Sequence, residues 1–323
     1  MATAPRPAAA VPGSRTRPGA GDRAAQARDP VGMEIRRRDG SVIAVDAVGE
    51  PDAALVLFCH GLADSRLSVH WFGQAAAELG LRILAPDRPG TGGSGPYQLG
   101  RLADWAEDAV LILDAVGAGT AALLGISGGG PYAAACAAAM PGRVRSLTLV
   151  SPLGMPGWPT RGMATGERFS LVLARHAPAF SGWSMGRLDA LARRRPDLFF
   201  RLAGTAMPDI DKRVLREPGV RESFLISYAE AFRRGSGGVA QDLRLLTRPW
   251  GVDLRAITAP VLICHGDADT TVPLQHARLY AEALPGARLH IHPGDGHFSI
   301  LAAARELLAP LAEQQGDGRA ATS

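Results

Sequence analysis

Short apolar runs alternate with helix-like patterns along most of the chain. Runs bounded by turn residues predict buried strands, and the segments between them show the spacing of amphipathic helices. This order of strand and helix is typical of an α/β fold, a mostly parallel sheet covered by helices. Predicted strands span residues 33–38, 41–48, 54–59, 81–85, 121–126, 144–150, 260–264 and 287–292, and predicted helices span residues 71–79, 102–116, 128–140, 274–284 and 298–311.

The alternation is interrupted in the middle of the chain, where strand-like runs disappear and Arg and large aromatic residues become frequent. We therefore expect a helical insertion, residues 153–255, within a core made of residues 31–152 and 256–312. Residues 1–30 are rich in Ala, Pro, Arg and Gly, and are expected to form a disordered tail. Residues 313–323 are expected to be flexible as well.

Composition excludes several classes of protein. With 46% hydrophobic and 20% charged residues, the chain fits neither a disordered nor a membrane protein. Its formal net charge is +4, but the basic residues, all Arg except Lys212, are spread among 31 acidic residues. No stripe of basic and aromatic residues is present, so no nucleic-acid partner is expected. The longest apolar stretch, residues 109–126, is interrupted by Asp114 and by a Gly-rich turn, so no membrane span is expected either.

The cysteines and the N-terminus indicate a cytoplasmic protein. Cys59, Cys136 and Cys264 lie in apolar runs without a CxxC motif, which favours buried, reduced thiols. The N-terminal segment lacks the apolar run of a secretory signal. No cluster of His, Cys and acidic residues has metal-ligand spacing, so neither a metal nor a cofactor is expected. The oligomeric state stays open.

The segment Gly125-Ile126-Ser127-Gly128-Gly129 lies where a predicted strand meets a predicted helix. A serine on such a sharp turn, which only small neighbours permit, would project above the sheet edge beside the first amides of the helix. The alternatives are a glycine-rich turn that serves close packing, or a phosphate-binding loop. A dinucleotide site would place its glycine loop in the first strand-helix unit, however, and this loop follows a later strand.

A nucleophilic serine needs a base, which is itself oriented by an acid. Two downstream loops carry such residues. Residues 264–273 follow a predicted strand and contain Asp267 and Asp269, and residues 294–298 precede the last predicted helix and contain His297. The chain thus supplies a serine, an acid and a histidine in that order.

With these segments the chain resembles an α/β-hydrolase of the serine-nucleophile, cap-bearing kind (esterase/lipase-like) over residues 33–311. In this resemblance Ser127 is the nucleophile and His297 the base. The family's acid loop has a proline four residues after the acid. Pro273 meets this pattern for Asp269.

The resemblance also covers two loops that precede the serine. His60-Gly61, after the third strand, is similar to the family's oxyanion segment, which implies that the backbone amides of Leu62 and Gly128 form the oxyanion hole. Residues 87–94 are similar to the family's glycine loop.

Alternatives for the acid stay open at this point. Asp267 lies two residues before Asp269 and could serve in its place. Asp295 is nearer to His297, but Gly294-Asp295-Gly296 is typical of a tight turn whose carboxylate binds its own backbone. The remaining candidate histidines are expected to have structural roles: His60, His265, His290 and His292.

A serine nucleophile points to acyl transfer, and the resemblance implies hydrolysis of a carboxylic ester, thioester or lactone without a cofactor. A small-molecule acyl substrate is expected. The same three residues could serve a lyase, a perhydrolase or a cofactor-free oxygenase, and a non-catalytic ligand binder is a third class. The aromatic residues of the insertion either form a small core or line an acyl pocket.

Overall fold

The computed structural model describes residues 32–284 and 286–313. The expected tails, residues 1–30 and 313–323, lie outside the described residues except for Glu313, which is the last residue of a helix. The central feature is an eight-stranded sheet, which confirms the predicted α/β class. Its strands are β1 (Met33–Arg36), β2 (Val42–Val48), β3 (Ala54–Cys59), β4 (Leu81–Pro86), β5 (Ala121–Ile126), β6 (Val144–Val150), β7 (Val261–Gly266) and β8 (Arg288–His292).

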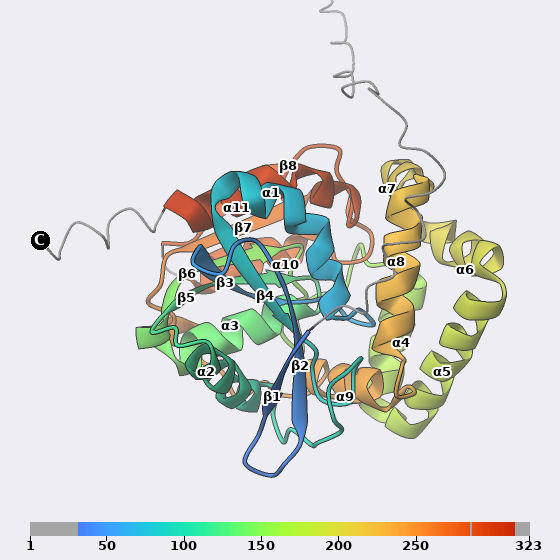
Figure 1. Cartoon of the computed structure of the whole chain (residues 1–323). Helices are drawn as coiled ribbons and strands as arrows, with labels where there is room; N and C mark the ends of the chain where they lie inside the picture. The colour runs from blue at the N-terminus through green and yellow to red at the C-terminus, as the bar shows by residue number, and fades with distance from the viewer. Residues whose placement is uncertain (1–31, 285, 314–323) are drawn as a thin grey trace, which may run out of the picture. The chain divides into compact units, whose positions relative to one another are not determined.

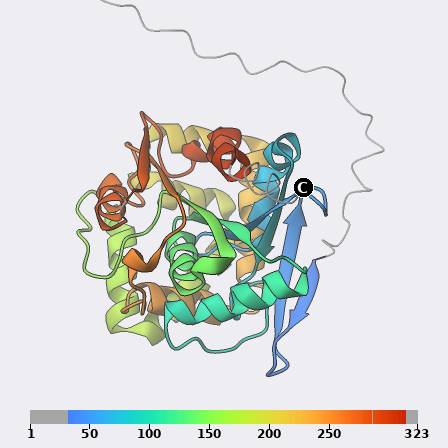
Figure 2. The same ribbon diagram turned by 90° about the vertical axis from the view of Figure 1, so that its left-hand side faces the viewer.

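The strands lie side by side in the order β1-β2-β4-β3-β5-β6-β7-β8. The pairs β1-β2 and β2-β4 are antiparallel, and all later pairs are parallel. Figure 2 shows the two N-terminal strands at one edge of the sheet. Because the inner strands are parallel, the loops at their carboxyl ends gather along a single edge, where α/β folds bind ligands.

Helices cover both faces of this sheet: α1 (Gly73–Leu79), α2 (Trp105–Ala115), α3 (Gly129–Ala139), α10 (Leu274–Ala283) and α11 (Ala304–Glu313). Side chains of β3 alternate between two cores. Leu57 packs on the side of α2, α3 and α10, and Phe58 packs on the side of α1 and α11. The helix predicted at residues 71–79 begins earlier, as a 3₁₀ helix over Arg66–Phe72, because the Ser65 hydroxyl accepts from the amide of Leu67 and caps it.

Six helices lie between β6 and β7: α4 (Thr165–His176), α5 (Pro178–Arg194), α6 (Pro196–Ala203), α7 (Asp209–Val214), α8 (Pro218–Ala231) and α9 (Gly237–Leu246). Proline begins α5, α6 and α8. The first N–H of a helix has no partner within the helix, so a proline at this position costs no hydrogen bond. Helices α4, α5, α6, α8 and α9 share a small apolar core, which includes Phe199, Tyr228 and the adjacent Phe232. Helices α4 to α8 gather at one side of the sheet (Figure 1).

The described chain contains no helix that is both long and apolar enough to cross a membrane. The three cysteines are buried and free, as the sequence predicts.

Candidate active site

The strained residue Ser127 lies between β5 and α3. Its φ of 54° is in the left-handed region, which is uncommon for a residue with a side chain. The turn is tight enough to demand glycine on both sides. A Cβ atom at Gly125 would lie 2.7 Å from the Cβ of Ala133, and one at Gly129 would lie 2.0 Å from the carbonyl oxygen of Cys59. Close packing of α3 on the sheet therefore holds the hydroxyl of Ser127 at the sheet edge.

A continuous chain of hydrogen bonds joins three residues that are far apart in the sequence. His297 Nε2 lies 3.0 Å from Ser127 Oγ, and His297 Nδ1 lies 2.7 Å from Asp269 Oδ2. Asp269 is further fixed by the amides of Thr271 and Val272, which donate to its Oδ1 at 2.8 Å. With Asp269 ionised, Nδ1 carries the proton and Nε2 is free to accept the serine proton.

Electrostatics agree with this arrangement of protons. Burial acts to raise the pKa of Asp269, but the charge and hydrogen bond of His297 outweigh it, and the pKa lies below its usual range. Burial acts to lower the pKa of His297, yet the carboxylate of Asp269 raises it above the usual range, with smaller contributions from Asp211 and Glu167. The pair thus favours a charged acid next to a histidine that binds a proton readily.

The two alternative acids lie elsewhere. Asp267 Oδ1 accepts from the amide of Gly294 at 2.7 Å and so joins the two loops. Asp295 Oδ1 accepts from the hydroxyl of Ser299 at 2.9 Å, rather than from its own backbone as the turn pattern predicts. Neither carboxylate bonds to His297, so Asp269 alone of the three candidates contacts the imidazole through Nδ1.

Within the described chain, none of the four remaining candidate histidines bonds to Ser127. His60 is fully buried, and its Nδ1 lies 3.0 Å from the carbonyl oxygen of Gly61. Burial holds the pKa of His60 well below its usual range. His265 Nε2 lies 2.9 Å from the carbonyl oxygen of Val272, within the loop that carries Asp269. His290 and His292 share one face of β8.

The amides of Leu62 and Gly128 lie together beside Ser127. A Cβ atom on Gly128 would be 3.1 Å from the backbone nitrogen of Leu62. Within the described residues, neither N–H donates to a protein acceptor. Two free amides next to a nucleophile can hold the negative oxygen of a tetrahedral intermediate.

A buried arginine sets the shape of the loop that carries Leu62. Arg88 is 1% exposed, and its two terminal nitrogens donate to the carbonyl oxygens of His60 and Gly61 at 2.7 Å. Its Nε donates to Asp242 of α9 at 2.7 Å, and the hydroxyl of Tyr132 donates to the other oxygen of Asp242. The glycine loop and the insertion thus jointly fix the backbone next to the serine. Nothing in the sequence pattern pairs Arg88 with a residue so distant.

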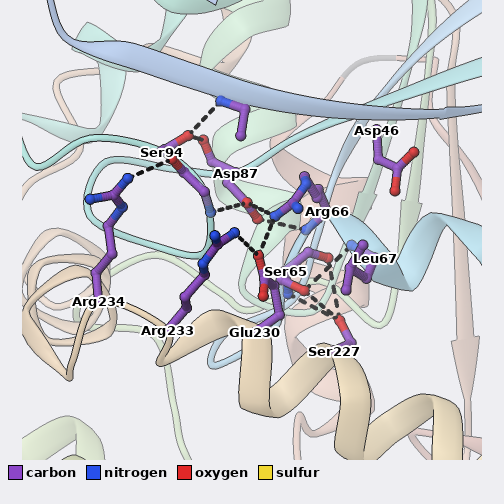
Figure 3. Close-up of polar contacts among 12 residues, drawn as sticks. Asp46, Ser65, Arg66, Leu67, Asp87, Ser94, Ser227, Glu230, Arg233 and Arg234 are labelled. Carbon is purple, nitrogen blue, oxygen red and sulfur yellow. Dashed lines mark hydrogen bonds and ion pairs between the residues drawn. The ribbon is translucent and has the colours of Figure 1, made fainter. Parts of the chain in front are cut away.

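A second buried arginine links the insertion to the same region (Figure 3). Arg66 Nη1 lies 2.5 Å from Asp87 Oδ2 and 2.6 Å from Glu230 Oε1 of α8. Ser227, one turn earlier in α8, donates to Asp64 Oδ1. These contacts anchor α8 to the loop that follows β3.

A third link reaches the loop that carries His297. Asp211 of α7 is fully buried and accepts three consecutive backbone amides: Oδ2 from His297 at 2.8 Å, and Oδ1 from Phe298 at 3.0 Å and Ser299 at 2.9 Å. The approach is close, because a Cβ atom at Gly296 would lie 2.3 Å from the carboxylate. Nothing in the sequence pattern points to Asp211, because its partners are backbone groups that carry no sequence signal.

A cavity of about 470 Å³ opens on Ser127 and His297. The insertion supplies much of its apolar wall, namely Met163, Leu171, Met185, Leu188, Phe199, Leu202, Met207, Phe224 and Leu243. Two carboxylates also line it, Asp64 and Glu167, and no Lys or Arg does so among the described residues. Burial raises the pKa of both carboxyls. Glu167 has no hydrogen bond or ion pair within the described chain.

Comparison with known proteins agrees with this fold. A family model described as alpha/beta hydrolase fold matches residues 54–304. The chain is 30% identical over 224 residues to a 2-hydroxymuconate semialdehyde hydrolase of Pseudomonas putida, covering 68% of this chain and 71% of that protein. It is 29% identical over 273 residues to a poly(3-hydroxyalkanoate) depolymerase of Ectopseudomonas oleovorans, covering 81% and 84%. An esterase structure from Rhodococcus sp. ECU1013 shares the fold, with a TM-score of 0.63 and 22% identity over 88% of this chain and 99% of that one.

Proposed function

The chain belongs to the α/β-hydrolase family, and on that premise we propose that it hydrolyses carboxylic esters through a covalent acyl-enzyme. The single observation that carries the proposal is the unbroken chain of hydrogen bonds from Ser127 through His297 to Asp269 at the floor of an apolar cavity. Serine, histidine and aspartate in this geometry form an acyl-transfer triad.

In the proposed reaction Ser127 Oγ attacks the ester carbonyl while His297 Nε2 takes its proton. The amides of Leu62 and Gly128 hold the oxygen as it becomes negative, and Asp269 stabilises the imidazolium. The carbon-oxygen bond to the alcohol then breaks, and His297 returns the proton to the leaving oxygen. Water, deprotonated by His297, cleaves the acyl-serine and restores the free hydroxyl.

We assign the helical insertion the role of a cap that selects the acyl group. The cavity above Ser127 has a volume of about 470 Å³, which is in the range of small-molecule sites. The wall of this cavity is mainly apolar. Phe199 and Phe224, whose rings both contact Tyr228 in the core of the insertion, also reach this wall. A neutral acyl chain would bury apolar surface there, which favours esters over charged substrates.

The name of the Pseudomonas putida relative indicates that the substrate of that enzyme carries a carboxylate. A substrate with a carboxylate fits the cavity of this chain less well. Asp64 and Glu167 would repel it when ionised, and among the described residues no cationic side chain lines the wall to pair with it. The charge of the cavity therefore favours hydrolysis of neutral esters over cleavage of a substrate that carries a carboxylate.

A panel of p-nitrophenyl esters, thioesters and lactones of graded acyl length tests the proposal. We expect turnover of neutral esters, loss of turnover in Ser127→Ala, and unchanged turnover in Ser184→Ala, a serine of α5 outside the cavity. If the folded wild-type protein hydrolyses none of these compounds, or if Ser127→Ala hydrolyses them at the wild-type rate, the proposal is wrong.

A further inference from the structure

Two histidines and a glutamate converge at the far edge of the sheet. His290 and His292 alternate on the edge strand β8 and so point to one face, with ring centroids 4.6 Å apart. Glu306 of α11 lies beside them, with its Oε1 3.5 Å from His290 Nε2. One ligand atom from each of the three residues lies within 4.8 Å of the others.

The buried member of this group has an unused nitrogen. His292 is 6% exposed, and its Nε2 has no hydrogen-bond partner within the described chain. Its Nδ1 lies 3.9 Å from Asp295 Oδ2, which is too long for a direct hydrogen bond. A buried polar nitrogen without a partner is costly, and a ligand placed between His292, His290 and Glu306 would satisfy it.

We propose that His290, His292 and Glu306 bind a divalent transition-metal ion, with Zn²⁺ as the ion that suits them best. Two neutral imidazoles and a carboxylate are a common donor set for zinc, and water would complete the tetrahedron. Tetrahedral bonds of about 2 Å place ligand atoms about 3.3 Å apart, so atoms that now lie up to 4.8 Å apart must approach by at most roughly 1.5 Å. The exposed side chains of His290 and Glu306 can rotate to allow this.

This site is separate from the catalytic one. None of its three residues lines the cavity above Ser127. Its ligands bracket the segment from residue 293 to residue 303, which carries His297 and joins β8 to α11. A bound ion would connect the two ends of this segment and stabilise the folded chain, whatever the reaction at Ser127.

Calorimetric titration of the chelator-treated protein, without a histidine tag, tests the site with ZnCl₂ as the probe. We expect one zinc per chain and at least tenfold weaker binding in His290→Ala and in Glu306→Gln, both exposed and so tolerant of substitution. His176→Ala, which removes an exposed histidine of α4, is the matched control and should bind as wild type.

Thermal melting gives a second readout that does not depend on catalysis. Because only the folded chain offers the site, the Tm should rise by about 2 °C for each tenfold excess of zinc over its Kd. The double variant His290→Ala/Glu306→Gln should lose this rise. Absence of saturable binding by the wild-type chain, or equal binding by the double variant, would overturn the proposal.

Discussion

Replacing Asp211 by Asn should impair catalysis although this residue does not line the substrate cavity. The carboxylate accepts three amides with two oxygens, and the amide of His297 is bound to Oδ2. An asparagine has only one acceptor oxygen. If that oxygen keeps Phe298 and Ser299, the NH₂ group of the new side chain faces the N–H of His297, and two donors oppose each other.

The size of the effect follows from the bond that is lost. A hydrogen bond to a charged acceptor contributes about 1.5–3 kcal/mol. If the loop that carries His297 shifts to separate the two opposed donors, the lost hydrogen bond no longer keeps the imidazole next to Ser127. We therefore expect kcat to fall roughly 10- to 150-fold, which is that energy expressed as a rate.

The pH profile separates positioning from general damage to the fold. His297 must be neutral to act as a base, so kcat/KM should rise with pH through its pKa, which lies above the usual value of about 6.5. The charge of Asp211 contributes to that rise in pKa. In Asp211→Asn the acid limb of the profile should move to lower pH.

The matched control is Asp209→Asn, on the same helix but exposed and paired only with Lys212 and other surface cations. It should change neither kcat nor the pH profile, since exposed ion pairs contribute little. Circular dichroism would show that both variants are folded. An Asp211→Asn protein with wild-type kcat and an unmoved acid limb would refute the assignment of Asp211 as a positioning residue.

Three further substitutions test the site. Asp269→Asn should lose about four orders of magnitude in kcat, because it favours the wrong tautomer of His297, and Asp267→Asn should lose much less. The reverse ranking, measured on one ester with both proteins folded, would make Asp267 the acid. Phe224→Ala should shift the relative kcat/KM between short and long acyl chains by about 1–3 kcal/mol, and an unchanged ranking would remove Phe224 from the acyl site. Glu167→Gln should raise kcat/KM for a half-ester of a dicarboxylic acid about fivefold relative to a neutral ester of equal length, equivalent to ~1 kcal/mol; an unchanged ratio would show that the carboxylate does not sense the acyl group.

Much of the fold could be predicted because its signals are local. The apolar runs of parallel strands, the glycines around Ser127 and the order of the serine, acid and histidine loops are all properties of short segments. The resemblance favours Asp269 over Asp267 through the spacing to Pro273, and in the structure Asp269 lies beside His297.

The contacts between the insertion and the catalytic loops could not be predicted in this way. Asp211 binds backbone amides 86 residues or more away, and Arg88 meets Asp242 across 154 residues. Such pairs depend on how α7 and α9 pack, and polar residues of a helical insertion look alike in sequence whether they face solvent or a distant loop. Glu306 lies on α11, outside the insertion, and the packing of that helix beside β8 brings it near His290.

The most direct test of the central claim is to locate the covalent adduct formed with a serine-directed fluorophosphonate. The base-activated hydroxyl of Ser127 should attack phosphorus as it attacks an ester carbonyl, and fluoride should leave. Intact-mass analysis should find one adduct per chain, peptide mapping should place it on Ser127, and Ser127→Ala should remain unlabelled. An adduct on another residue, or none on the folded wild-type protein, would contradict a nucleophilic role for Ser127.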